Sequence, residues 1–193
     1  MAVKPAEATA HFGFGSALFA LGRTEEALAR YRMAVQLKPG YSEAHIQIGQ
    51  ILLSRGELAE AASHFRAALA SQPDLGLAHL GLGRVAQQLG RPAEATASFE
   101  QAIRHAPNNP LVQSTWAETL ARRGQFAEAV PHYERAVQLQ PKDPGAHAAL
   151  GYVLFLTNRR SEAVAQWKEA LRLEPDFPGL RERLLKVRQE SGN

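Results

Sequence analysis

Residues 10–22 read AHFGFGSALFALG, and a version of this stretch returns every 34 residues along the chain. Its first six letters reappear as AHIQIG at 44–49, AHLGLG at 78–83 and AHAALG at 146–151, while VQSTWA at 112–117 fills the remaining slot. Other columns keep the same period without an insertion: the alanines Ala27, Ala61, Ala95, Ala129 and Ala163, the aromatic residues Tyr31, Phe65, Phe99, Tyr133 and Trp167, and the prolines Pro39, Pro73, Pro107, Pro141 and Pro175. Self-similarity at a fixed period of this length indicates a repeat architecture, and it decides how every shorter motif is interpreted.

The glycines of the first stretch also look like a phosphate-binding loop. A dinucleotide fingerprint occurs once, directly after a strand, and opens a helix. Here the glycine pattern occurs at least four times, and no strand-like run precedes any copy. We therefore expect no nucleotide site in this stretch.

Each 34-residue unit predicts two helices. In the second unit, apolar residues at helical spacing run from Ala44 to Arg55, and a second set includes Ala61, Phe65 and Ala68. The residues expected to end the first helices are those that tolerate a left-handed backbone: Gly22, Gly56, Gly90, Gly124 and Asn158. The second helices should stop before the closing prolines, because proline disfavours helix in the residue before it. Pro92 fits a helix start, and we expect Pro131 in about the first turn of its helix.

The small residues in fixed columns predict close helix packing. Two antiparallel helices need a small side chain where their axes come nearest, and the columns of Gly15 and Ala27 supply it. The aromatic column of Tyr31 would fill the space beside that contact. One helix pair cannot bury its apolar stripe alone, so stacked copies should form one continuous core.

A 34-residue helix–turn–helix with these glycine, alanine, aromatic and closing proline positions resembles the tetratricopeptide repeat (TPR). The resemblance covers residues 8–177, and it implies an all-α, right-handed α-solenoid of five repeats, at 8–41, 42–75, 76–109, 110–143 and 144–177, followed by a capping helix at 178–193. The family often has tryptophan where this chain has His11, His45, His79, Gln113 and His147. It often has tyrosine where this chain has Leu18, Leu52, Ala86, Leu120 and Leu154, so somewhat softer packing is expected.

Composition excludes several classes of function. Hydrophobic residues make up 45% and charged residues 21% of the 193 residues, which is typical of a folded chain. The net charge of +3 comes from 22 basic and 19 acidic residues without a run of five or more like charges, so nucleic acid is not an expected partner. Cysteine is absent, no apolar stretch is long enough to span a bilayer, and MAVKPAEATA at 1–10 lacks the regions of a secretory signal. If the chain is complete, the expected location is the cytoplasm.

The seven histidines do not predict a metal or catalytic site. Four of them share one column, so successive rings should lie roughly 10 Å apart, too far to share one ion. His64 and His132 form a second column, two repeats apart. We interpret both columns as packing at a helix–helix seam. No Ser–His–Asp or paired-carboxylate arrangement occurs, and we expect no metal, no cofactor and no enzymatic activity.

The resemblance implies that partners bind the concave face, which the first helix of each repeat lines. Mapped residue by residue, the candidate partner-binding residues are Phe12, Phe19, Ile46, Gln50, Leu53, Leu77, Leu80, Arg84, Gln87, Arg122, Tyr152 and Phe155. On this hypothesis, aspartate at Leu53 and Leu80 abolishes partner capture and leaves the helices intact. An alternative stays open, in which neighbouring repeats cover several of these side chains.

The expected function is that of a non-enzymatic scaffold that binds a peptide or an amphipathic helix in its groove. The alternative is a TPR region of a larger bacterial enzyme, such as a glycosyltransferase, that presents or regulates a substrate. The helix at 8–21 carries no charge and has apolar residues on more than one face. Because an all-round apolar helix is normally buried, we expect a partner or an upstream repeat to cover this helix, with a second copy of the chain as the other alternative.

Overall fold

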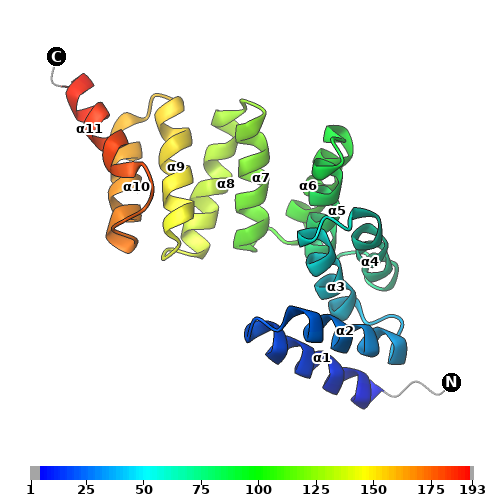
Figure 1. Cartoon of the computed structure of the whole chain (residues 1–193). Helices are drawn as coiled ribbons and strands as arrows, with labels where there is room; N and C mark the ends of the chain where they lie inside the picture. The colour runs from blue at the N-terminus through cyan, green and yellow to red at the C-terminus, as the bar shows by residue number, and fades with distance from the viewer. Residues whose placement is uncertain (1–4, 192–193) are drawn as a thin grey trace. The chain divides into compact units, whose positions relative to one another are not determined.

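The structure, a computed structural model, describes residues 5–191 of the chain, and it describes side chains for residues 6–187. This part contains eleven helices and no strand. The helices are α1 (Pro5–Ala20), α2 (Thr24–Leu37), α3 (Ser42–Ser54), α4 (Leu58–Ser71), α5 (Gly76–Gln88), α6 (Pro92–His105), α7 (Pro110–Arg122), α8 (Phe126–Leu139), α9 (Pro144–Leu156), α10 (Arg160–Leu173) and α11 (Leu180–Ser191). The first ten form five antiparallel hairpins, each within one 34-residue window apart from the first residues of α1 (Figure 1). The expected all-α repeat architecture is confirmed.

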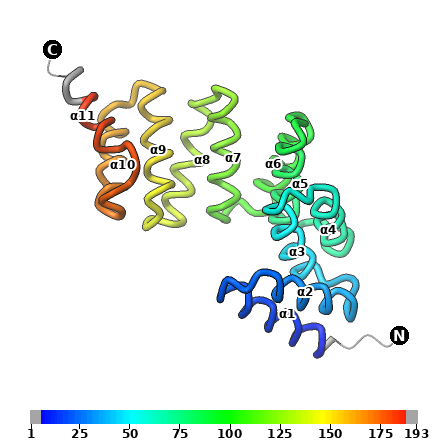
Figure 2. Tube along the Cα trace, viewed as in Figure 1, coloured from blue at the N-terminus to red at the C-terminus, as the bar shows by residue number. Residues whose placement is uncertain are grey.

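The chain divides into two compact units, Met1–Ala106 and Pro107–Asn193, which we call unit 1 and unit 2. In unit 1, α2 packs on α3, and α5 packs on both α3 and α4. In unit 2, α8 packs on α9, and α10 packs on α11. Each unit has a hydrophobic core of its own, and the chain trace in Figure 2 follows the hairpins of each unit in sequence order.

The turn inside each hairpin follows the expected glycine or asparagine. The backbone φ angle is +75° at Gly22, +77° at Gly56, +69° at Gly90 and +77° at Gly124, and it is +62° at Asn158. A left-handed residue lets the chain leave the first helix while the next amide still bonds back to it, as Arg23 N–H does to the Leu18 carbonyl at 2.9 Å. The sequence prediction of five equivalent turns is therefore confirmed.

The second helix of every hairpin ends before its closing proline, as expected. Pro92 is the first residue of α6, also as expected. Pro131 lies deeper than expected, since it is the sixth residue of α8 rather than part of the first turn. At that depth the missing N–H leaves the Ala127 carbonyl without its usual helical donor.

The glycine column lies against the aromatic column, as the sequence predicted. A Cβ atom placed on Gly49 would lie 2.8 Å from the Phe65 ring, and one on Gly83 would lie 2.4 Å from the Phe99 ring. Phe65 is also covered from the next hairpin, because a Cβ on Gly81 would lie 2.4 Å from the same ring. Absence of a side chain at these glycines thus allows the aromatic ring to fill the gap between helices.

This contact predicts that replacing glycine with alanine has opposite effects on stability at two helical positions. Gly83→Ala should destabilise unit 1 by about 1–3 kcal/mol, because the new methyl group overlaps the Phe99 ring. Gly13→Ala should stabilise it by up to about 1 kcal/mol, because Gly13 has nothing within 4 Å and alanine is the better helix former. Chemical denaturation of both variants measures the difference. Effects of the same sign would contradict the assigned packing.

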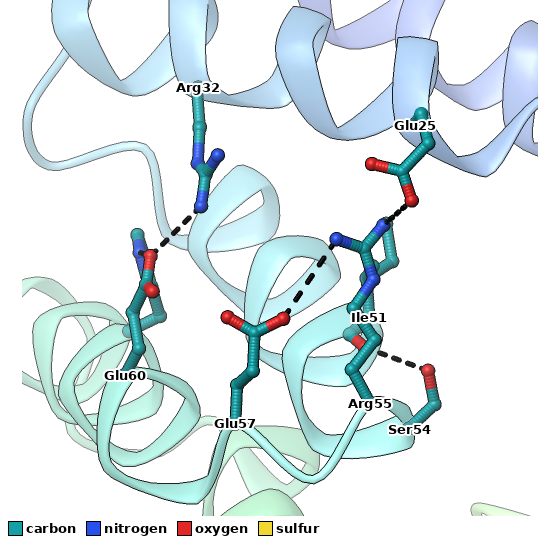
Figure 3. Close-up of polar contacts among 8 residues, drawn as sticks. Glu25, Arg32, Ile51, Ser54, Arg55, Glu57 and Glu60 are labelled. Atoms are coloured by element: carbon teal, nitrogen blue, oxygen red, sulfur yellow. Dashed lines mark hydrogen bonds and ion pairs between the residues drawn. The ribbon is translucent and has the colours of Figure 1, made fainter.

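Ion pairs link the first two hairpins on the surface of unit 1 (Figure 3). Arg32 on α2 lies 3.0 Å from a Glu60 carboxylate oxygen on α4, and Arg55 lies between Glu25 and Glu57. The Arg32 and Glu60 side chains are about half exposed, so such a pair contributes no more than about 1 kcal/mol. The apolar core therefore holds the hairpins together, and the ion pairs add a little to their alignment.

Candidate partner-binding surface

Three of the candidate contact residues in unit 1 are buried. Ile46, Leu53 and Leu80 are 5%, 4% and 3% exposed, and the first two belong to the core cluster of unit 1. The expectation that these three side chains line an open groove is wrong for this structure, because α3 and α5 pack on one another as well as on α4. The alternative noted from the sequence, that neighbouring repeats cover some of the groove residues, holds at these positions.

The other candidates in unit 1 differ in exposure. Phe19 is 46% exposed and Arg84 is exposed. Gln50, Leu77 and Gln87 are half-buried. Phe12 is half-buried because its ring lies 5.5 Å from the ring of Tyr31 and 5.1 Å from that of Tyr41. In unit 1, Phe19 and Arg84 are therefore the candidates most accessible to a partner.

The three candidates in unit 2 remain accessible. Arg122 is exposed and pairs with Glu118 at 2.6 Å, one helical turn earlier. Tyr152 is 41% exposed, and the guanidinium of Arg183 lies 5.2 Å from its ring centre. Phe155 is half-buried and packs on Trp167, with the ring centres 5.7 Å apart. Below this surface, burial and the charge of Glu118 raise the pKa of Tyr133 to about 12, so its hydroxyl stays neutral.

Of the hollows that open on unit 2, two are lined by residues of α7 or α9. The smaller, of about 110 Å³, lies where α7, α8 and α9 meet, and Leu111 and Ser114 are among its lining residues. The larger, of about 430 Å³, lies between α11 and the last hairpin. Leu111 is 47% exposed, and the family resemblance places both Leu111 and Ser114 on the first-helix face. Unit 2 thus combines exposed apolar side chains with concave surface.

The histidine column has a hydrogen-bonding role. Nε2 of His45 lies 2.8 Å from the carbonyl oxygen of Pro39, so this nitrogen donates and Nδ1 is left as an acceptor. Nδ1 of His64 lies 2.9 Å from that acceptor and donates to it. In the fourth hairpin the Gln113 amide takes the place of the histidine, and its oxygen accepts from Nδ1 of His132 at 2.8 Å. Among the described residues, no group of three or more His, Asp or Glu side chains could hold a metal ion.

The half-buried histidines His64 and His132 predict a dependence of stability on pH. Burial, followed by the charge of His45, lowers the pKa of His64, and burial lowers the pKa of His132. A base with a lowered pKa in the folded state binds fewer protons than the unfolded chain, so stability is complete above an unfolded pKa of about 6.5 and falls as the pH drops through it. Urea unfolding at pH 7.5 and pH 5 should show this loss.

Replacing both histidines tests their share of the effect. His64→Gln with His132→Gln introduces the amide side chain that Gln166 supplies at the equivalent position, where its Oε1 lies 2.7 Å from Nδ1 of His147, and it removes both titratable rings. The double variant should therefore reduce the pH dependence. His105→Gln changes an exposed ring and should leave the dependence in place. An unchanged pH profile in the double variant would contradict this account.

Comparison with known proteins identifies the family. The sequence profile of the cytochrome c-type biogenesis protein H TPR domain matches residues 53–178, about two thirds of the chain. The chain belongs to this TPR family. A second profile, of the general TPR repeat, matches residues 15–53. No curated protein sequence matches the chain. The family assignment made from the repeat columns is confirmed.

Solved TPR structures share the fold. The crystal structure of YrrB, described as a TPR protein with an unusual peptide-binding site, is 23% identical, with 91% of this chain and 90% of that chain covered and a TM-score of 0.63. TTC0263, a thermophilic TPR protein in Thermus thermophilus, is 22% identical, with 93% and 98% covered and a TM-score of 0.71. A chain of the APC/C hetero-tetramer Cut9–Hcn1 is 17% identical, with 93% and 36% covered and a TM-score of 0.81. At these identities the likeness establishes the TPR fold.

The TPR period continues into α11, which the sequence interpretation treated only as a cap. The column of His45 donates to the carbonyl of the preceding closing proline in successive hairpins: His45 to Pro39 at 2.8 Å, His79 to Pro73 at 3.0 Å, Gln113 to Pro107 at 2.7 Å, and His147 to Pro141 at 3.1 Å. Arg181, 34 residues after His147, donates to the Pro175 carbonyl at 2.7 Å. Thus α11 takes the place of a sixth first helix.

The position of α11 adds residues that were not among the candidates from the sequence. Arg183, Lys186 and Val187 of α11 line the larger hollow together with Phe155. Extending the 34-residue period one step further would have indicated them, because Lys186 aligns with Tyr152 and Val187 with Val153. The exposed charges of α11 concealed this match, since they suggested a purely solvating helix. Among the described residues, no helix is long and apolar enough to cross a membrane.

Proposed function

We propose that this TPR chain is a non-enzymatic scaffold that binds a peptide or an amphipathic helix on the first-helix face of unit 2, formed by α7, α9 and α11. The observation that carries the proposal is the exposure of large apolar side chains beside two hollows. Leu111, Tyr152 and Leu156 are 47%, 41% and 40% exposed. Exposed apolar side chains beside a concave surface are typical of partner sites. A peptide that places a few apolar anchor side chains in pockets fits this arrangement.

The polar groups of this face favour binding over catalysis. Arg122 and Glu118 neutralise one another. His45 bonds to His64 through a ring nitrogen, and the amide of Gln113 bonds to His132 and to the Pro107 carbonyl. A catalytic site would need a nucleophile next to a base, oriented by a third group. The same polar roles recur from one hairpin to the next, as expected of structural positions.

Selection from a library of random twelve-residue peptides displayed on phage tests the proposal without an assumption about the partner. Selected peptides should bind the full chain with micromolar dissociation constants. Leu111→Ser with Tyr152→Ser should weaken them by about tenfold or more, because two apolar anchors are lost. The matched control, Met33→Ser with Leu89→Ser, removes similarly exposed apolar side chains from unit 1 and should have no effect. Failure to enrich any peptide, or equal losses in both variants, would refute the proposed site.

A second candidate is self-association through α1. Phe14, Phe19 and Leu21 are 50%, 46% and 73% exposed, and each large apolar side chain that a second copy covers is worth roughly 1.5–3 kcal/mol. Sedimentation velocity at rising concentration should show association in the micromolar range. Phe14→Glu with Phe19→Glu should abolish it, whereas Phe12 is unsuitable for the test because it packs on Tyr31 and Tyr41. A strict monomer at high concentration would contradict this candidate.

A further inference from the structure

The larger hollow of unit 2, which we call the α11 pocket, has an apolar floor. Its apolar lining residues are Phe155 from α9, Trp167 from α10 and Val187 from α11, and Gly179 lines it without a side chain. Phe155 is half-buried, whereas Trp167 and Val187 are buried. Its volume of about 430 Å³ falls within the range of about 300–1,000 Å³ that is typical of ligand sites. An apolar side chain of a peptide therefore fits inside it.

The rim of the α11 pocket is cationic. Its charged lining residues are Arg183, Lys186 and Glu182, so the cations outnumber the carboxylate. Among the described residues, neither Arg183 nor Lys186 has a carboxylate partner, although the guanidinium of Arg183 lies over the Tyr152 ring at 5.2 Å. By contrast, several arginines pair with a glutamate three or four positions away, among them Arg23, Arg122, Arg159 and Arg172. Within residues 6–187, Arg183 and Lys186 thus place two cationic side chains without a carboxylate partner beside aromatic lining residues.

We propose that the α11 pocket recognises an acidic side chain next to an apolar one in the partner peptide. The apolar side chain lies against Phe155 and Trp167, and the neighbouring carboxylate accepts hydrogen bonds from Arg183 and Lys186. Stacking on Tyr152 holds the guanidinium of Arg183 in place while its N–H groups stay free to donate. This inference rests on the proposed function. It adds the chemical character of the partner and assigns its recognition to α11.

Defined peptides test the charge preference. The first is a ten-residue peptide, acetylated and amidated, with a Phe-Leu pair flanked by two glutamates on each side. The second has glutamine in place of each glutamate, and a third has lysine. A fourth carries its only carboxylate at a free C-terminal phenylalanine, which distinguishes a terminal from a side-chain carboxylate. In a Trp116→Phe background, Trp167 is the single tryptophan of the chain, so its emission reports occupation of the pocket.

The glutamate peptide should bind with a micromolar dissociation constant and change Trp167 emission, and the glutamine peptide should bind about tenfold more weakly. Arg183→Glu with Lys186→Glu should reverse the order and select the lysine peptide. The matched control, Arg66→Glu with Arg104→Glu, makes the same change in net charge at exposed positions of unit 1 and should keep the original order.

Equal affinity for the glutamate and glutamine peptides, tighter binding of the terminal carboxylate, or no reversal in the charge-swapped variant would each overturn the pocket assignment. The phage selection separates this failure from failure of the proposed function. Selected peptides that bind the wild-type chain and the Arg183→Glu, Lys186→Glu variant equally would overturn the acidic preference and leave the scaffold proposal standing. A selection that enriches no peptide would overturn both.

Discussion

Replacing Phe65 with alanine is expected to lower the free energy of unfolding by about 3–5 kcal/mol, the usual cost of removing a fully buried aromatic side chain. The Phe65 ring is 0% exposed. It fills the space over Gly49 in its own hairpin and over Gly81 in the next, and neither glycine has a side chain that could move into the void. The substitution therefore weakens the contact within one hairpin and the contact between two hairpins together.

Chemical denaturation followed by circular dichroism measures this loss. Phe14→Ala is the matched control, because it makes the same substitution at a ring that is 50% exposed on α1. The control should change the free energy of unfolding by less than about 1 kcal/mol. Comparable losses in the two variants would mean that the aromatic column does not form the core of unit 1.

Leu80→Asp is expected to cost at least about 4 kcal/mol and to unfold much of unit 1. The Leu80 side chain is 3% exposed, so the substitution removes buried apolar area and places a carboxylate where water cannot solvate it. An unpaired buried charge is among the few single changes with an effect of this size. This expectation reverses the interpretation of Leu80 as a groove residue, for which aspartate would leave the helices intact.

Far-ultraviolet circular dichroism and a thermal melt test it. Gln88→Asp is the control, since Gln88 is an exposed residue of the same helix. A folded Leu80→Asp variant with nearly normal helical content would show that the position is solvent-accessible, and it would return Leu80 to the partner surface.

The sequence predicted the features that depend on the backbone preference of a single residue type, and those that depend on a residue type recurring every 34 residues. The left-handed turns at Gly22 and Asn158, the helix ends before proline and the fit of Gly83 against Phe99 all follow from one-dimensional periodicity. The hydrogen bond between His45 and His64 was missed because it joins two columns that lie 19 residues apart and face one another only after the hairpin closes.

Burial was the least predictable property of the candidate site. Leu53 and Phe155 occupy the same column, yet Leu53 is 4% exposed and Phe155 is half-buried beside a pocket. The difference depends on which neighbour packs on each position, and a single repeat does not contain that information. The role of α11 was missed for a related reason, since its charged residues conceal a period that only the hydrogen bond from Arg181 to the Pro175 carbonyl makes plain.

On the function proposed above, partners bind the first-helix face of unit 2. Amide NMR of the full chain, titrated with the tightest peptide from the phage selection, tests it most directly. The largest chemical-shift changes should fall on α9 and α11, around Tyr152, Phe155 and Arg183, with smaller ones near Leu111 on α7. Changes confined to the second helices, α8 and α10, or to unit 1 would contradict it.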